Sequence, residues 1–105
     1  MPDDVLEMIG TAALLEQLAE ESAELAQAAL KMARKIRNEN PTPKSRADCI
    51  ANLQEEIADV ELCISILPAA LNDPAEVGMT MSAKHRRWNE RLHDEKLWEV
   101  GNHED

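Results

Sequence analysis

Residues 14–25 read LLEQLAEESAEL and residues 53–67 read LQEEIADVELCISIL. In both stretches apolar residues recur every three or four positions, which is the spacing of an amphipathic α-helix. Each stretch also carries a pair of acids three residues apart: Glu21 and Glu24, then Glu56 and Asp59. Residues three apart lie on one face of a helix, so each pair projects two carboxylates in nearly one direction. Two such helices packed side by side would bring four carboxylates together.

The first pair belongs to a predicted helix from about residue 12 to residue 37, preceded by a short apolar pattern that Gly10 and Thr11 interrupt. The apolar stripe of this helix consists of Leu15, Leu18, Ser22, Leu25, Ala29, Met32 and Ile36. At about 100° per residue, Glu21 lies roughly 60° from the centre of the stripe. We therefore expect Glu21 at the edge of the packed interface.

The linker NENPTPK, residues 38–44, contains two prolines that cannot continue a helix. It is short enough to predict an antiparallel hairpin. Ser45 and Asp48 then resemble the start of a capping box that opens the second helix. This helix carries Ile50, Leu53, Ile57, Val60, Ile64 and Leu67 on one stripe, and its second half is also apolar at Leu62, Cys63 and Ile66. Asp59 therefore enters a region that we expect to be largely buried, where an ionised carboxylate is costly unless it is paired or metal-bound.

Pro68 ends or kinks the second helix, and Asp73 is a candidate N-cap for a third helix from Pro74 to about residue 98. Its predicted inward-facing residues are Val77, Met81, Trp88, Leu92 and Trp98. No strand pattern is present, so the sequence predicts an all-α fold: an antiparallel helical hairpin plus a third long helix. Because a hairpin buries only one face of each helix, we expect oligomerisation to complete a core of the four-helix-bundle type.

Length and charge restrict the class of protein. With 105 residues we expect one domain, residues 1–105. The net charge of −10 argues against binding a nucleic acid polymer, which needs clustered positive charge. The start MPDDVLEMIG lacks the features of a signal peptide, and no apolar run is long enough to span a membrane. Cys49 and Cys63 would lie about 21 Å apart along one helix, so we expect two free core thiols and a cytoplasmic protein.

The acidic pairs favour a metal site over an ordinary solvated surface. Each pair stands beside a further acid, Glu20 or Glu55, and no lysine or arginine lies within either cluster. The carboxylates in each cluster repel one another and lie next to an apolar segment, and no basic side chain offsets this repulsion. This pattern is typical of a cation site without its cation. Oxygen-only ligands suit a hard cation, so we expect magnesium, with manganese as a possible substitute.

The order of these residues resembles the MazG-like nucleoside triphosphate pyrophosphohydrolases of the all-α NTP pyrophosphatase superfamily, over roughly residues 9–92. The family's E-x-x-E and E-x-x-D motifs are matched by Glu21, Glu24, Glu56 and Asp59, and its leading acid by Glu20. The resemblance implies that the four matched acids bind the metal. It also implies magnesium-dependent hydrolysis of a nucleoside triphosphate to the monophosphate and pyrophosphate, by a homodimer or homotetramer. Glu20 or a ligating glutamate such as Glu21 would orient the attacking water.

The substrate's phosphates must be met by the metal and by side chains, because the chain has only three glycines and no phosphate-binding glycine-rich loop. Lys84, Arg87 and Arg91 form one cationic stripe on the third helix, and the resemblance implies that such a helix supplies phosphate-binding groups. Lys31 is a weaker candidate of the same type. The alternative is that these cations form surface salt bridges with the many acids. Trp88 could stack on a nucleobase, although a tryptophan at helical spacing is more often part of a core.

Two rival interpretations remain. Glu90 and His93 have the Glu-x-x-His spacing of di-iron carboxylate bundles, but the chain holds only one copy of that motif. A non-catalytic helical interaction protein could also retain the acidic cluster without the chemistry. Activity measurements are needed to distinguish that protein from an enzyme, because both predict that removing an acid relieves repulsion.

Overall fold

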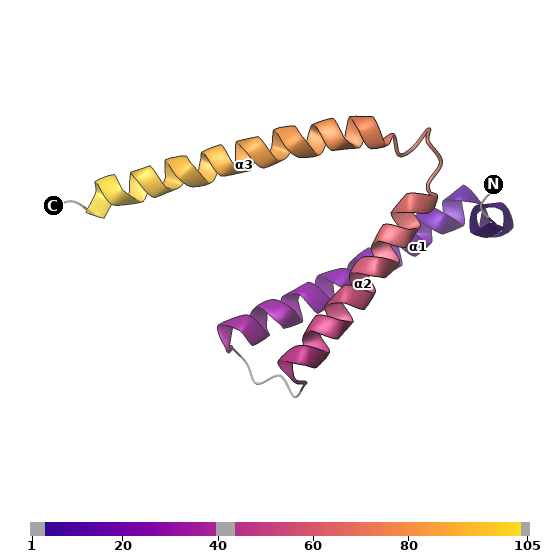
Figure 1. Cartoon of the computed structure of the whole chain (residues 1–105), viewed down its shortest axis with the longest axis horizontal. Helices are drawn as coiled ribbons and strands as arrows, with labels where there is room; N and C mark the ends of the chain where they lie inside the picture. The colour runs from indigo at the N-terminus through magenta and orange to yellow at the C-terminus, as the bar shows by residue number, and fades with distance from the viewer. Residues whose placement is uncertain (1–3, 40–43, 104–105) are drawn as a thin grey trace. The chain divides into compact units, whose positions relative to one another are not determined.

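The computed structural model describes residues 4–39 and 44–103, with side chains up to Lys96. These residues form three helices and no strand: α1 Asp4–Arg37, α2 Arg46–Ile66 and α3 Pro74–His103 (Figure 1). The prediction of an all-α fold with a hairpin and a third helix is confirmed. None of the described helices is long and apolar enough to cross a membrane. Most of the predicted linker, residues 40–43, and the side chain of Trp98 lie outside the described part.

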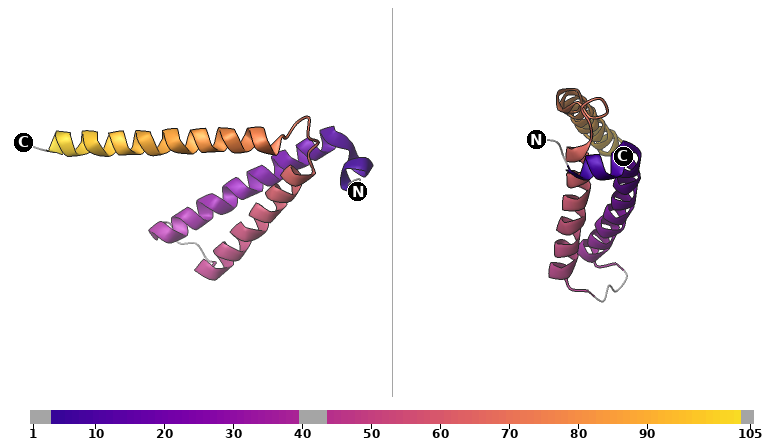
Figure 2. Two further views of the ribbon diagram at one scale, coloured as in Figure 1. Left: turned by 45° about the horizontal axis from the view of Figure 1, so that its top comes forward. Right: turned by 90° about the vertical axis from the view of Figure 1, so that its right-hand side faces the viewer.

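The first helix begins earlier than predicted and changes direction at Gly10. Gly10 has φ 83° and ψ 166°, whereas the residues on either side of it are helical. This backbone conformation is almost restricted to glycine, because a Cβ atom would strain it. Figure 2 shows the first turns, drawn in indigo, bent away from the rest of α1. The interruption predicted at Gly10 is therefore a kink between two helical segments.

The predicted helix starts are confirmed by their caps. The Ser45 side chain accepts a hydrogen bond from the backbone N–H of Asp48 at 3.1 Å. The Asp73 carboxylate accepts hydrogen bonds from the N–H groups of Ala75 and Glu76 at 3.0 and 3.4 Å. These caps satisfy backbone donors that have no partner within the first turn of a helix. The helix α2 ends directly before Leu67 and Pro68, because the residue before a proline is disfavoured in the helical conformation.

The hairpin is made by α1 and α2, which lie side by side. Its buried residues are Leu14, Ala28, Met32, Cys49 and Cys63. The predicted stripe on α1 is confirmed in part: Met32 is buried, and Leu18 and Leu25 are half-buried. The interface is rotated slightly from that stripe, because Leu15 and Ile36 are 42% and 58% exposed. Leu14 and Ala28 are buried instead of Leu15 and Ala29. Apolar side chains cover more than one face of α1, and packing against α2 selects the face that contains Leu14. This rotation brings Glu21 closer to the centre of the interface than predicted.

The chain divides into two compact units, Met1–Pro68 and Ala69–Asp105. In the second unit, the four described residues among those expected to face inward from α3 are exposed. Trp88 is 60% exposed and Met81 is 65% exposed, and Val77 and Leu92 are exposed as well. The spacing of apolar residues shows that one face of a helix can be buried, but it does not identify the segment or subunit that packs against that face. These exposures are those of a single chain, so the inward orientation, like the single domain, stays a prediction.

Replacing Gly10 by alanine tests the kink. The added Cβ would meet no atom within 4 Å, so the cost comes from the backbone conformation alone. We expect Gly10→Ala to lower the free energy of unfolding by about 1–3 kcal/mol, measured by urea denaturation. Gly78→Ala is the matched control, because Gly78 lies inside α3 and also has open space around it. There alanine should stabilise the helix by up to about 1 kcal/mol. Equal stabilisation by both substitutions would exclude a strained Gly10.

Candidate metal centre

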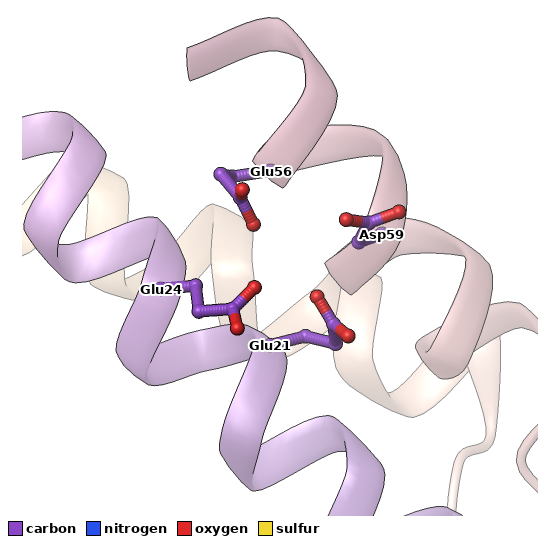
Figure 3. A group of neighbouring side chains, drawn as sticks. All are labelled: Glu21, Glu24, Glu56 and Asp59. Atoms are coloured by element: carbon purple, nitrogen blue, oxygen red, sulfur yellow. The ribbon is translucent and has the colours of Figure 1, made fainter. Parts of the chain in front are cut away.

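Four carboxylates from two helices converge inside the hairpin. Glu21 and Glu24 project from α1, and Glu56 and Asp59 project from α2. One oxygen of each side chain lies within 4.8 Å of the chosen oxygens of the other three. Figure 3 shows the four side chains pointing toward one another from the two helices. The structure thus brings together both acidic pairs that the sequence analysis singled out.

Two of the four carboxylates occupy positions where a hairpin would normally place core residues. Every seventh residue of a helix lies on nearly the same line along its surface. Glu21 and Glu56 each stand midway between two buried residues of such a line. The buried residues in the two lines are Leu14 and Ala28 on α1, and Cys49 and Cys63 on α2. The packing that forms the hairpin therefore also forces these two acids inward.

The two halves of the cluster correspond to each other by a constant offset of 35 residues. Adding 35 to the number of Glu21 gives Glu56, and the same shift converts Glu24 into Asp59. Because α1 and α2 are antiparallel, the offset pairs the first acid of one helix with the second acid of the other. Accordingly, Glu21 lies beside Asp59 and Glu24 lies beside Glu56 (Figure 3).

The cluster carries like charges that no base neutralises. Glu21, Glu56 and Asp59 are half-buried and Glu24 is exposed. The Oε2 atoms of Glu21 and Glu56 are buried and have no hydrogen-bond partner. In the described part of the chain no lysine or arginine forms an ion pair with any of the four acids; the ion pair that is present joins Arg37 to Glu39 at 3.9 Å. Buried anionic oxygens without donors are costly, and a bound cation would remove that cost.

The proton affinities of two of the acids reflect this environment. For Glu21 the largest influence is the hydrogen bond from Gln17, which lowers its pKa, but burial and repulsion by Asp59 and Glu24 outweigh it and raise the pKa above the ordinary value. Burial raises the pKa of Glu56, and the neighbouring Glu24 carboxylate raises it further. Both acids therefore hold a proton more readily than an exposed glutamate does.

The hydrogen bond from Gln17 is a feature that the sequence analysis missed. The Gln17 Nε2 atom donates to Glu21 Oε1 over 2.8 Å, across one turn of α1. Glutamine and glutamate four residues apart are neighbours on a helix surface, so the spacing could have revealed this contact. Gln17 therefore belongs to the surroundings of the cluster although it is not an acid.

Cys49 and Cys63 are free and buried, as predicted. The pKa of the Cys63 thiol is raised by burial and by the nearby carboxylates of Glu21 and Asp59. A thiol in this environment stays protonated at neutral pH, and a protonated thiol is a poor ligand and nucleophile. Cys63 therefore packs beside the cluster and leaves an oxygen-only donor set, which suits a hard divalent cation.

The other predicted site residues lie outside the cluster. Glu20 and Lys31 are exposed on α1. Lys84, Arg87 and Arg91 are exposed on α3, in the second unit, where they line an open hollow together with Trp88. Glu90 and His93 are also exposed on α3. Among the described residues, the group that could hold a metal ion contains neither of them.

Comparisons of the chain with models of protein families, with curated proteins and with solved structures found no match. The resemblance to the MazG-like pyrophosphohydrolases stays a prediction. The residues that carry it are the four that the hairpin gathers: Glu21, Glu24, Glu56 and Asp59.

The raised pKa values predict how the metal-free protein responds to pH. Glu21 and Glu56 bind protons more tightly in the folded chain than in the unfolded chain, where the pKa is near 4.5. Over the window between 4.5 and the raised values, the folded state binds more protons, so stability increases as pH falls and decreases as pH rises. We expect the urea midpoint, measured with a chelator, to rise as the pH is lowered from neutral toward 5.

A variant with both Glu21→Gln and Glu56→Gln is the control for this pH dependence. It removes the two titrating groups while keeping the size of their side chains. We expect it to be at least as stable as the wild type at neutral pH, because repulsion is relieved, and to show a flatter profile. A wild-type midpoint that falls steadily from pH 7 to pH 5 would contradict the raised pKa values.

Proposed function

We propose that the protein hydrolyses a nucleoside triphosphate between the α and β phosphates, giving the monophosphate and pyrophosphate, with magnesium as cofactor. The proposal rests mainly on the four carboxylates that meet inside the hairpin. Three of the four acids are half-buried and none of the four has a basic partner, which is unfavourable unless a cation binds them. Their order along the chain, E-x-x-E followed by E-x-x-D, is the order of the MazG-like enzymes.

In this proposal Glu21, Glu24, Glu56 and Asp59 hold the metal. The buried Oε2 atoms of Glu21 and Glu56 have no donor of their own, which supports their use as ligands. When bound, magnesium supplies charge that stabilises the phosphoryl group and lowers the pKa of a coordinated water. Manganese, which also prefers oxygen ligands, should substitute for it.

The chain's own acids would position the attacking water and accept its proton. Water adds to the α phosphorus, the bond from phosphorus to the bridging oxygen breaks, and pyrophosphate leaves with that oxygen. Glu20 and Glu21 are the candidates for the base. Glu20 is exposed and directly precedes Glu21 in the chain, whereas Glu21 is half-buried within the cluster.

Cationic side chains would bind the phosphates that the metal leaves uncovered. Lys84, Arg87 and Arg91 are exposed along one face of α3 and make no ion pair in the described part of the chain. Arginine can bind phosphate oxygens through two parallel hydrogen bonds. Lys31 on α1 is the remaining candidate.

A second copy of the chain is the partner that we propose for the hairpin. On both helices, several inward-facing residues are followed in the sequence by an apolar residue. On α1, Leu15 follows Leu14. On α2, the inward-facing Cys49, Glu56 and Cys63 are followed by Ile50, Ile57 and Ile64. Because the helices are antiparallel, the same rotation on each helix points to the same side of the hairpin. All four apolar residues are exposed and none is charged. Two chains of net charge −10 can approach most easily through such a face.

The alternative function is that of a non-catalytic helical interaction protein. The exposed Trp88 and Met81 on α3 favour it, because exposed aromatic and methionine side chains are common at protein interfaces. This alternative predicts no turnover and no metal-dependent change in stability.

Mutation of the apolar face tests self-association. We expect the wild-type protein to be a dimer or tetramer by light scattering, and Ile57→Asp to shift it toward the monomer, because a buried charge in an interface costs several kcal/mol. Leu30→Asp is the matched control, since Leu30 is 60% exposed on α1 and does not belong to the apolar face. A wild type that is monomeric at high concentration would contradict the proposed partner.

The first test of the reaction is pyrophosphate release from a panel of ribo- and deoxyribonucleoside triphosphates, with magnesium and with a chelator. We expect turnover only with the metal, and a loss of about 100-fold or more for Glu56→Gln, which removes a ligand. Glu16→Gln is the control, because Glu16 is exposed on α1 outside the cluster, and it should retain activity. No turnover on any nucleotide with magnesium or manganese would exclude the enzyme and favour the interaction protein.

A further inference from the structure

The surroundings of the carboxylate cluster are not the same on its two sides. On α1, Gln17 donates a hydrogen bond from Nε2 to Oε1 of Glu21 at 2.8 Å. The other oxygen of Glu21, Oε2, is buried without a partner and belongs to the side chain that Figure 3 shows directed at Asp59. One oxygen of this carboxylate is thus held by an amide, and the other is left for a ligand.

The chemistry of the donor matters as much as its position. A lysine or arginine at residue 17 could also hold Glu21, but it would add a positive charge beside the cluster and weaken its attraction for a cation. An amide N–H donates a hydrogen bond and carries no net charge. Gln17 therefore restricts the carboxylate while the cluster keeps its full negative charge.

The equivalent position on α2 lacks this contact. Shifting Gln17 by 35 residues gives Asn52, which stands four residues before Glu56 as Gln17 stands before Glu21. Asparagine is one methylene shorter than glutamine, and in the described part of the chain no hydrogen bond joins Asn52 to Glu56. The Oε2 atom of Glu56 is likewise without a partner. Gln17 is thus the amide that fixes a carboxylate of the cluster before a cation arrives.

We propose that Gln17 is a positioning residue for a divalent cation: it holds one oxygen of Glu21 so that the other faces Glu24, Glu56 and Asp59. This inference rests on the proposed metal site and assigns a role to a residue outside the four ligands. Groups that orient a ligand typically change metal affinity by 10- to 100-fold when they are removed. Because Gln17 is exposed, we expect the lower end of that range, a loss of about tenfold.

The test is calorimetric titration of the full chain with manganese and with magnesium. Gln17→Met keeps the length and helix propensity of the side chain but removes the donor. Gln27→Met makes the same change at another exposed position of α1 and is the matched control. We expect metal affinity to fall about tenfold for Gln17→Met and to stay unchanged for Gln27→Met. The stability of the metal-free protein should be similar in both variants.

A kinetic measurement separates positioning from a general structural effect. If Gln17 only orients Glu21, the activity of Gln17→Met should recover at saturating magnesium, whereas that of Glu56→Gln should not. Wild-type affinity in Gln17→Met, or an equal loss in both methionine variants, would overturn the role of Gln17 and leave the proposed metal site intact. A wild type that binds neither metal would instead remove the metal site itself, and the role of Gln17 with it.

Discussion

Electrostatic repulsion among four carboxylates is the constraint that most strongly limits the stability of the hairpin. Glu21 and Glu56 occupy the centres of two lines of residues whose flanking positions are buried. A hairpin built for stability alone would place apolar side chains there, and among the residues with described side chains only five are buried and could offset this cost. The hairpin therefore keeps half-buried acids between its buried positions. Such an arrangement is expected where binding chemistry competes with stability.

Local signals in the sequence predict much of this structure. The helix starts at Ser45 and Asp73 depend on side chains that bond to nearby backbone groups, and the kink at Gly10 depends on one residue, so short-range reasoning finds them. The meeting of the two acidic pairs follows from their spacing and from the short linker. Non-local features were not accessible in the same way. The phase of the α1 interface depends on which of two apolar faces α2 covers, and the exposure of Trp88 depends on the surroundings of α3.

The offset of 35 residues could also have been read from the sequence. The segments EESAEL and EEIADV begin at Glu20 and Glu55 and contain the same arrangement of acids. The correspondence is incomplete in a consistent way. Asp59 and Asn52 are each one methylene shorter than their counterparts Glu24 and Gln17. The α1 half of the cluster therefore has the longer side chains and the amide contact. The carboxylates of α1 would extend further from their helix toward a bound cation than those of α2.

The distribution of charge places a requirement on the order of binding. Acids dominate the hairpin, whereas the segment 84–91 of α3 holds four cations and one acid. A free triphosphate would be repelled by the carboxylate cluster, because like charges at short range in a partly buried site interact strongly. A metal at the cluster reverses the local field. In the proposed function the nucleotide must therefore arrive with its metal or after it, and the cations of α3 alone cannot replace that ion, since they neutralise the phosphates without relieving the repulsion among the four acids.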